Sequence, residues 1–537
     1  MKPIVPIALC LGVALVWSSG YAASLDEKSG VAGAAGSLSG TRPNIIFIFS
    51  DDHGAQSIGA YGAKLGVDVT PRIDELASQG VRFDHCFCGN ALCGPSRATV
   101  LTGKFSHANG YSQNDGQAPF DGNQPTLPKY LHQVGYETAI FGKWHLESKP
   151  TGFDAWKVLV GQGVYYNPVF VTPAGKETIK GYVSDVTTDL ALNWLSQQHD
   201  ANKPFLLMIH QKAPHRNWIP GPQEMALWKG TSFPEPGNLY DDYSGRGPGA
   251  AHQQMEIGRH MHEESDLQVG TSIANPTRDV AGMPPEDKKV WHQALDDENI
   301  AFLEKKPTGK DLVHWKYERY MMNYLRCCKG VDRNVGRVLD YLKEHNLEKN
   351  TLVIYSSDQG FFLGEHGWFD KRWIYEESLR MPLIMRWPGH ITPGSASEAT
   401  VQNTDFMPTF LDLAGVKLPT DIHGKSIVPV LEHKQDNLHD AAYYHYYEKK
   451  EHNVPKHTGI RTDRYTLAWF YDEAPAYWEL FDREKDPAQM KSVYDDPAYA
   501  KVREELTAKL KELAAKYGDR TPPWGNEAPA STGGKME

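Results

Sequence analysis

Residues 44–54 read NIIFIFSDDHG, a continuous apolar run that ends in two adjacent aspartates. Apolar, β-favouring residues without alternation are typical of a strand that is buried on both faces, as in the centre of a parallel sheet. Two carboxylates at the end of such a strand repel each other unless a positive charge lies between them. A hard divalent cation explains the pair economically, and a solvated acidic turn is the alternative. We therefore expect an α/β fold with a cation site at the carboxyl edge of its sheet.

Three further apolar strands are predicted, and each leads into polar residues. The strands are expected at 138–141, 204–210 and 351–355. The polar residues after them are Lys143, His145, His215, Asp358 and Gln359. Any one such histidine is more often structural than catalytic, but carboxylates, a lysine and histidines at several strand ends point to one site. Segments of helical spacing alternate with the strands, so we expect a large mixed, mostly parallel sheet flanked by helices.

Residues 93–104, CGPSRATVLTGK, are predicted to form a loop that turns into a helix. Pro95 suits the first helical position and Gly103 suits the end. Cys93 would then lie just ahead of a helix N-terminus, where unpaired N–H groups favour an anion. Arg97, one turn on, adds a charged fork suited to tetrahedral oxyanions. This local pattern alone fits a reactive cysteine and a free thiol in a capping turn equally well.

The ends of the chain and its charge limit the class of protein. The chain has 537 residues and a net charge of −11 with no basic run, which argues against nucleic acid and anionic membranes as main partners. Residues 1–22 are predicted to be a signal peptide, because a lysine precedes a short apolar stretch and small residues. That stretch is short for a membrane span. Residues 23–42 are expected to be a flexible lead-in, and the protein to be periplasmic or secreted.

The cysteines of the predicted mature chain are odd in number. They are Cys86, Cys88, Cys93, Cys327 and Cys328. In an oxidising compartment one thiol then lacks an intrachain partner, and Cys93 is the obvious candidate. The sequence leaves open whether Cys86 or Cys88 pairs with Cys327 or Cys328.

Two regions are expected on compositional grounds. Residues 43–435 would form a catalytic domain, with an insertion at about 220–310 that is rich in Gly, Pro, His and charge. Residues 436–537 would form a smaller subdomain, because short strands precede a final amphipathic helix at 498–517. We expect an antiparallel sheet with a packed helix there.

The predicted strand-end residues, with Lys371 on a later polar loop, suggest a reaction class. Oxygen ligands without a Cys/His cluster indicate Ca²⁺ or Mg²⁺ rather than zinc. Convergent Arg and Lys side chains imply a sulfate or phosphate group in the substrate. Histidines are suited to proton transfer. Together these residues indicate a metal-assisted ester hydrolase.

The cysteine motif, the two aspartate clusters and Lys143-Trp144-His145 resemble those of type I sulfatases, within the alkaline phosphatase superfamily. The resemblance covers nearly the whole mature chain. It implies that a maturation enzyme oxidises Cys93 to Cα-formylglycine, whose hydrate attacks sulfur. It also implies a Ca²⁺ or Mg²⁺ site made by Asp51, Asp52, Cys93, Asp358 and Gln359. The implied catalytic residues are Arg97 on the hydrate, Lys143 and Lys371 on the sulfate oxygens, His145 at the nucleophile and His215 at the leaving oxygen.

Segments 161–168, 212–218 and 240–243 look like those of the bacterial N-acetylglucosamine-6-sulfatase group. This resemblance implies a sulfated saccharide substrate, with Trp218, His366 and Arg372 as candidate substrate-binding residues; ordinary packing is the alternative. Two other functions stay open at this point. One is a formylglycine-dependent phosphodiesterase or phosphonate monoester hydrolase, and the other is an inactive sulfoglycan-binding protein. The sequence does not indicate an oligomeric state.

Overall fold

The computed structural model describes residues 37–114, 116–270, 280, 282–449 and 451–524. The predicted signal peptide, 1–22, and residues 23–36 of the predicted lead-in lie outside the described residues. Among the described residues, none of the helices combines the length and apolar character needed to cross a lipid bilayer. Residues from Ser37 onward belong to one compact unit, so the predicted boundary at 436 stays a prediction.

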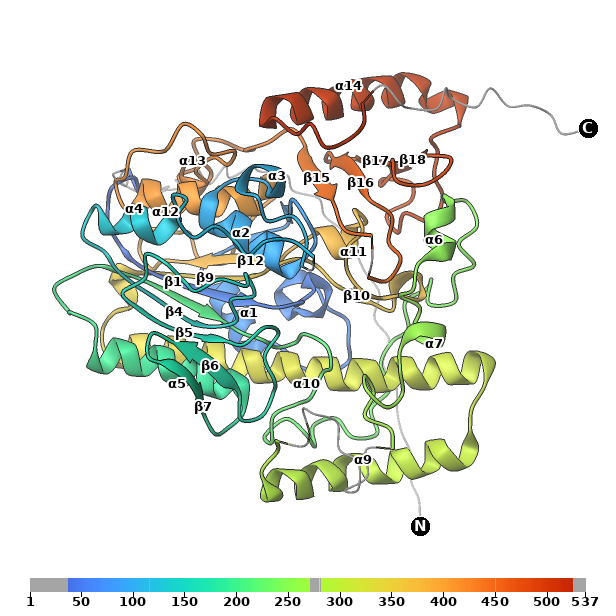
Figure 1. Ribbon diagram of the computed structural model, residues 1–537, viewed down its shortest axis with the longest axis horizontal. Coiled ribbons are helices and arrows are strands. Elements are labelled where there is room, and N and C mark those ends of the chain that lie inside the picture. The colour runs from blue at the N-terminus through green and yellow to red at the C-terminus, as the bar shows by residue number, and fades with distance from the viewer. Residues whose placement is uncertain (1–36, 115, 271–279, 281, 450, 525–537) are drawn as a thin grey trace, which may run out of the picture. The chain divides into compact units, whose positions relative to one another are not determined.

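A large mixed sheet contains the predicted strands. Within the described residues ten strands pair in the order β13-β2-β12-β9-β1-β8-β4-β5-β6-β7 (Figure 1). The neighbours from β9 to β5 are parallel, and the pairs beyond them are antiparallel except for β13 with β2. In chain order the strands are β1 (Asn44–Ser50), β2 (Val81–Phe83), β4 (Glu137–Gly142), β5 (Ala155–Leu159), β6 (Val169–Thr172), β7 (Gly175–Thr178), β8 (Phe205–His210), β9 (Thr351–Ser357), β12 (Leu383–Arg386) and β13 (Ser395–Ser397). The predicted mixed, mostly parallel sheet is confirmed.

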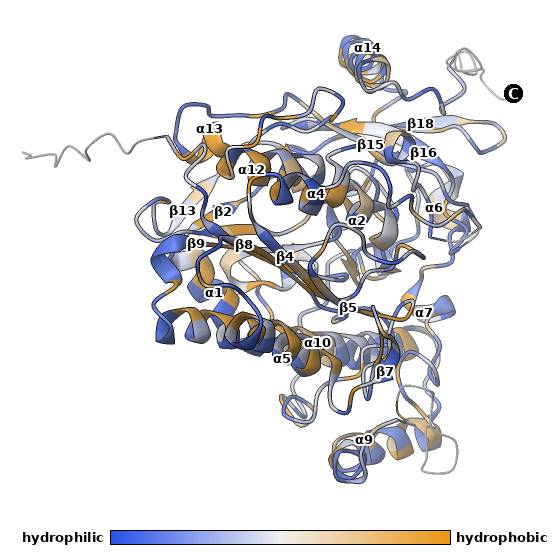
Figure 2. Cartoon of the chain, turned by 60° about the vertical axis from the view of Figure 1, so that its left-hand side comes forward, coloured by the Kyte–Doolittle hydropathy of each residue, from blue (hydrophilic) through white to orange (hydrophobic). Residues whose placement is uncertain are grey.

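Strand β1 is buried on both faces, as its continuous apolar sequence predicts. On one face the ring of Phe47 contacts Phe406 and Phe410 of helix α12 (Phe406–Leu413), with ring centroids 5.8 and 5.7 Å apart. Ile46 and Ile48 point the other way, into a core shared with helices α1 (Pro71–Ser78), α5 (Val183–Gln197) and α10 (Gly309–Glu344). Full burial of one such side chain contributes about 1.5–3 kcal/mol. The alternating side chains of β1 therefore pack on both sides of the sheet. Figure 2 shows helices on the two faces, with α12 on one and α1, α5 and α10 on the other.

Helices alternate with the strands along the chain, as the sequence predicts. The main ones are α1 (Pro71–Ser78), α2 (Cys93–Thr102), α4 (Leu127–His132), α5 (Val183–Gln197), α9 (Pro285–Lys305) and α10 (Gly309–Glu344). The region 220–310, predicted as an insertion, also contains the short helices α6 (Pro248–His252) and α7 (Ile257–His260). Helix α10 is 36 residues long, and its buried face includes Val331, Val335, Val338 and Leu339.

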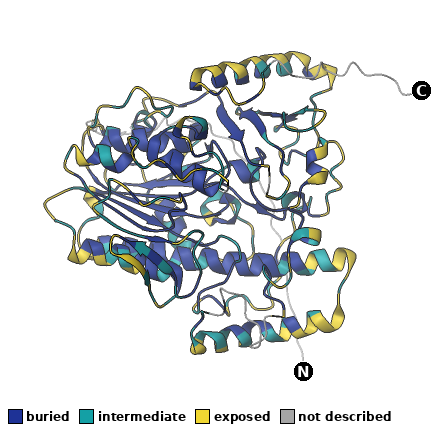
Figure 3. Ribbon diagram, viewed as in Figure 1, coloured by how far each residue is buried: buried dark blue, intermediate teal, exposed yellow. Residues whose placement is uncertain are grey.

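The C-terminal strands form the predicted small antiparallel sheet. Its strands are β15 (Ala442–Tyr446), β16 (His457–Arg461), β17 (Tyr465–Phe470) and β18 (Tyr477–Asp482). Helix α14 (Ala500–Tyr517) packs on it through Leu506, Leu510 and Leu513, which are buried as the spacing predicts. The opposite side of α14 is exposed (Figure 3).

The described cysteines are all free thiols. Cys86 and Cys88 lie in the core on one face of the sheet, and Cys327 and Cys328 lie in the core on the other face. The sheet separates the two pairs, so the pairing that the sequence left open does not occur.

Candidate functional site

The cysteine motif begins a helix that is buried along its whole length. Cys93 is the first residue of α2 and Pro95 is the third, so the predicted start is wrong by two residues. The first N–H groups of a helix have no intrahelical acceptor, and a proline at the third position therefore loses no hydrogen bond. Gly103 ends the helix in the left-handed conformation, with φ of 64°, as predicted. Cys93 thus lies inside the protein, at the positive end of a helix dipole.

The predicted metal ligands meet at the carboxyl edge of the sheet. Asp51 follows β1 and Asp358 follows β9, and these parallel strands are in register, with Ser50 opposite Ser357. Carboxylate oxygens of Asp51, Asp52 and Asp358 all lie within 4.8 Å of one another. All three side chains are fully buried. Residues more than 300 positions apart in sequence are therefore joined in one acidic cluster.

Three cations contact this cluster. Arg97 donates to Asp358 Oδ2 through Nε at 3.1 Å and Nη2 at 2.8 Å. Lys143 Nζ bonds Asp51. Lys371 Nζ lies 2.5 Å from Asp52 Oδ1 and 3.6 Å from Cys93 Sγ. With every group ionised, the three carboxylates and three cations sum to zero charge.

Burial governs the protonation of the site. Burial raises the pKa of Asp358 to about 8 and that of Asp52 to about 6. For Asp51 the effect of burial is outweighed by the positive charges of Lys143 and Arg97, which hold its pKa well below the usual range. Burial also raises the pKa of the Cys93 thiol to about 12, against the opposing effect of Lys143 and Lys371. The unmodified thiol is therefore protonated at neutral pH and is a poor nucleophile.

The donor atoms of the cluster fit a divalent cation. Three buried oxygens, Asp51 Oδ1, Asp52 Oδ2 and Gln359 Oε1, have no hydrogen-bond partner among the described residues. Buried acceptors are normally satisfied, so each of these needs a further partner. Carboxylate and amide oxygens are hard ligands of the kind that bind Ca²⁺ or Mg²⁺. The amide nitrogen of Gln359 bonds Asp52, which turns the amide oxygen away as a free ligand.

Two histidines lie beside the cluster. The Nε2 atom of His215 is 3.9 Å from Asp52 Oδ2, and its ring lies within reach of both Asp51 and Cys93. His145 follows Lys143 at the end of β4, has φ of 54°, and its Nδ1 lacks a described partner. Burial, reinforced by Lys143, holds the pKa of both rings well below the usual value. Each neutral ring offers one donor and one acceptor.

Two of the predicted substrate-binding residues, Trp218 and His366, are fully buried. Trp218 is enclosed by other side chains, its ring centroid 4.5 Å from that of Tyr320, and its contact with a sugar stays a prediction. His366 is also fully buried, and its Nδ1 lies 2.7 Å from Arg246 Nη1. Both residues therefore belong to the packed interior.

Arg372 lies next to Lys371, and its contacts leave its predicted role open. It pairs with Asp370 at 3.2 Å and with the half-exposed Glu451 at 2.9 Å. Its role in substrate binding stays a prediction.

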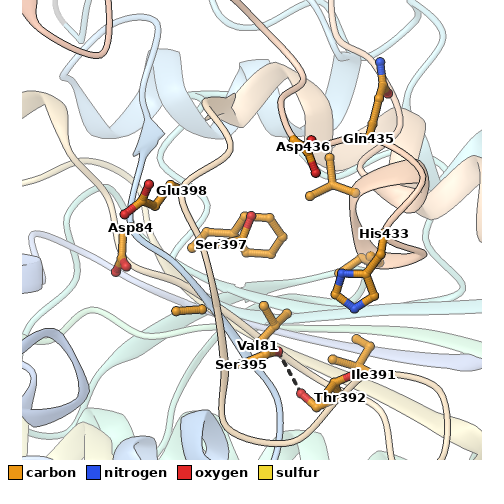
Figure 4. A pocket seen from close by; sticks show the side chains of 14 residues that line it. Val81, Asp84, Ile391, Thr392, Ser395, Ser397, Glu398, His433, Gln435 and Asp436 are labelled. Atoms are coloured by element: carbon orange, nitrogen blue, oxygen red, sulfur yellow. Dashed lines mark hydrogen bonds between the residues drawn. The ribbon is translucent and has the colours of Figure 1, made fainter. Parts of the chain in front are cut away.

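A cavity of about 460 Å³ lies away from this cluster, at the edge strand β13 (Figure 4). Its polar lining includes Asp84, Glu398, His433 and Asp436. None of the residues predicted for catalysis or metal binding lines it. The chemistry of the chain is therefore concentrated around Cys93 and not in this cavity.

Two residues that the sequence reasoning missed contact the site. Asn114 Oδ1 accepts the N–H of Gly94 at 3.1 Å, and Asn114 Nδ2 lies 3.9 Å from Cys93 Sγ. Gln162 accepts a hydrogen bond from Lys143 Nζ. Both residues lie in loops whose sequence has no distinctive signal for such contacts, although Gln162 is in the quoted 161–168 segment.

Comparisons with known proteins agree with this geometry. The family described as Sulfatase matches residues 43–416, and the family described as N-sulphoglucosamine sulphohydrolase, C-terminal, matches residues 364–516. The chain is 47% identical over 495 residues to the N-acetylglucosamine-6-O-sulfatase of Bacteroides thetaiotaomicron, covering 90% of this chain and 88% of that relative.

Solved structures extend the comparison. BT4656 in complex with its substrate D-glucosamine-2-N,6-O-disulfate matches with a TM-score of 0.86 at 46% identity, covering 90% of this chain and 99% of that one. The phosphonate monoester hydrolase of Agrobacterium radiobacter matches with a TM-score of 0.63 at 21% identity, covering 89% and 96%, which shows a shared fold alone. With a family match over most of its length and a relative of this similarity, the chain belongs to the sulfatase family and is a sulfuric ester hydrolase.

Proposed function

We propose that the chain hydrolyses the 6-O-sulfate ester of a glucosamine residue, N-acetylated or N-sulfated, in a sulfated glycan. The observation that carries the proposal is Cys93 at the start of a buried helix, surrounded by three carboxylates and three cations. The identity of the sugar is supported by the similarity to N-acetylglucosamine-6-O-sulfatase and to the glucosamine disulfate complex.

Position 93 would carry the nucleophile after oxidation to Cα-formylglycine by a maturation enzyme. The raised pKa of the Cys93 thiol supports this step, because a buried, protonated thiol would attack sulfur slowly. The hydrated aldehyde would supply a hydroxyl in its place. Arg97, which is paired with Asp358, lies one helical turn from residue 93 and would bind the hydrate.

Asp51, Asp52, Asp358, Gln359 and the modified residue 93 would hold Ca²⁺, with Mg²⁺ as the alternative. When bound, the cation supplies Lewis acidity and charge at the sulfate group. Lys143 and Lys371, which bond Asp51 and Asp52 beside Cys93, would contact the sulfate oxygens.

The remaining side chains would handle protons and the sugar. His215 would supply the hydrogen bond to the leaving oxygen, and His145 would act on the nucleophile. Arg372 would contact the sugar at the edge of the site. The predicted signal peptide supports a periplasmic or secreted location.

Substrate profiling tests the proposal. The full chain, expressed with a formylglycine-generating enzyme, is assayed for release of sulfate from 6-sulfated N-acetylglucosamine and N-sulfated glucosamine. Sulfated galactose, uronic acid sulfates and phosphate mono- and diesters serve as competitors. We expect the 6-sulfated glucosamines to have the highest kcat/KM. A higher kcat/KM for another sulfated sugar would refute the substrate assignment. A higher kcat/KM for a phosphorus ester would favour the phosphodiesterase alternative.

A further inference from the structure

The backbone of Asp52 has a conformation that an aspartate seldom adopts. Its φ is 67°, in the left-handed region, where the side chain of an L-residue crowds the backbone. Consecutive side chains of an extended strand point to opposite faces. The left-handed turn instead allows the carboxylates of Asp51 and Asp52 to approach Asp358 together. The cation site of the proposed function therefore depends on this turn.

The hydroxyl of Tyr324 bridges the turn from outside. It donates to the carbonyl oxygen of Asp52 at 2.8 Å and accepts from the N–H of Gly54 at 2.9 Å. These two backbone groups lie on either side of His53. One side-chain oxygen on α10 thus closes a ring of hydrogen bonds around the segment 52–54.

The ring of Tyr324 is itself held in place. It is fully buried and stacks on Phe361, with ring centroids 5.8 Å apart and planes 8° apart. It also packs edge-on against Tyr320, the residue one turn earlier in α10. The hydroxyl therefore has little freedom to follow the turn if the turn relaxes.

Two backbone N–H groups of the turn bond side chains at the end of the sheet. The N–H of Asp52 donates to Asp358 Oδ1 at 3.1 Å, and the N–H of His53 donates to Ser357 Oγ at 2.8 Å. Ser357 is the last residue of β9 and Asp358 follows it. Tyr324 lies on a helix instead, and its hydroxyl bonds the carbonyl oxygen of Asp52.

We propose that Tyr324 is a positioning residue that sets the affinity of the cation site through the backbone of Asp52. The inference rests on the cation site of the proposed function. Outer contacts that orient metal ligands typically change metal affinity by 10- to 100-fold when removed. Because Tyr324 acts on the backbone of a single ligand, we expect a change near the lower end of that range.

The helix provides a matched control. Tyr320 is also fully buried, and its hydroxyl donates to the carbonyl oxygen of Phe362 at 2.7 Å, away from the turn. Tyr324→Phe and Tyr320→Phe each remove one buried hydroxyl from the same helix and keep the ring. Only the first removes a contact with the segment 52–54.

Calorimetric titration of Ca²⁺ and Mg²⁺ into the metal-stripped full chain measures affinity without turnover, and melting in EDTA measures stability separately. We expect Tyr324→Phe to weaken binding about tenfold and Tyr320→Phe to leave it within twofold, with similar melting temperatures in EDTA. Unchanged affinity in Tyr324→Phe, or equal losses in both variants, would overturn the inference. A wild-type chain that binds neither cation would instead overturn the cation site of the proposed function.

Discussion

Asn114 supports the proposed nucleophile through the two ends of one amide. Its Oδ1 accepts the N–H of Gly94, and its Nδ2 faces the Cys93 sulfur, which an oxygen would replace in the modified residue. Asn114→Asp keeps the acceptor and removes the donor, whereas Asn114→Ala removes both. The two variants therefore separate support of the helix start from support of the nucleophile.

Loss of the Nδ2 donor of Asn114 should lower kcat, whereas loss of its Oδ1 acceptor should lower Tm. A hydrogen bond to a charged group is worth about 1.5–3 kcal/mol, and about 1.4 kcal/mol corresponds to tenfold in rate. We therefore expect Asn114→Asp to lower kcat by about 10- to 100-fold. Loss of an acceptor at a helix start costs about 0.5–2 kcal/mol, and a chain of this length unfolds with roughly 1 kcal/mol per degree. Asn114→Ala should also lower Tm, by about 0.5–2 °C.

The assay is sulfate release from 6-sulfated N-acetylglucosamine, corrected for the formylglycine content found by mass spectrometry, with Tm measured in parallel. Asn109→Asp is the control, because the two described hydrogen bonds of the Asn109 side chain are both to backbone groups: its Nδ2 donates to the carbonyl of Lys104 at 3.0 Å, and its Oδ1 accepts from the N–H of Tyr111 at 2.9 Å. A wild-type kcat in Asn114→Asp would refute the positioning role. A raised KM with unchanged kcat would also refute it and would assign the effect to repulsion of the anionic substrate.

Three other predictions test the site and its support. Cys93→Ala should abolish sulfate release with little change in Tm, and retained turnover would contradict the nucleophile assignment. Chelation should lower activity and Tm together, since a cation at 100 times its Kd stabilises by about 2.7 kcal/mol, or about 3 °C for this chain. At Glu376, burial raises the pKa but Arg461 and Arg483 outweigh it, giving about 2. The pKa of Glu376 in the folded chain lies below its unfolded value, so its ion pairs with the two arginines stabilise the fold above pH 4.5. This contribution to the free energy of unfolding, about 3 kcal/mol, is lost as the pH falls toward 2. Melting from pH 7 to 3 should show this loss in the wild type and a smaller one in Glu376→Gln.

Two of these tests have a control variant in the chain. Cys327→Ala removes a buried thiol from α10, outside the site, and should keep its turnover. Glu505→Gln alters a glutamate on α14 whose side chain is 63% exposed, and its melting should follow pH as the wild type does. If EDTA changed neither activity nor Tm, even after prolonged dialysis, the acidic cluster would not be a cation site.

The central strands and the residues at their ends could be predicted because burial on two faces leaves a clear sequence pattern. β1, β8 and β9 are continuous apolar runs, and parallel pairing brings their carboxyl ends to one edge. The antiparallel continuation through β6 and β7 could not be predicted in the same way. β7 is mostly exposed and polar, so no apolar periodicity marks it as a strand.

The orientation of single side chains was the other limit. Trp218 follows the His215 segment closely, which suggested a place at the site, yet its indole turns into the core against α10. The sequence alone does not distinguish a tryptophan in a packed core from a tryptophan in a sugar-binding site. Asn114 shows the converse, since its contact with Cys93 depends on a loop fold that local sequence does not encode.

The balance of three carboxylates and three cations around Cys93 has a consequence for the end of the reaction cycle. With all six of these groups ionised, a divalent cation would give the site a charge of +2. A sulfate monoester brings −1, whereas the released sulfate ion brings −2 and neutralises the site completely. Electrostatics therefore favours the product over the substrate, and we expect inorganic sulfate to compete with the sugar ester and its departure to limit turnover.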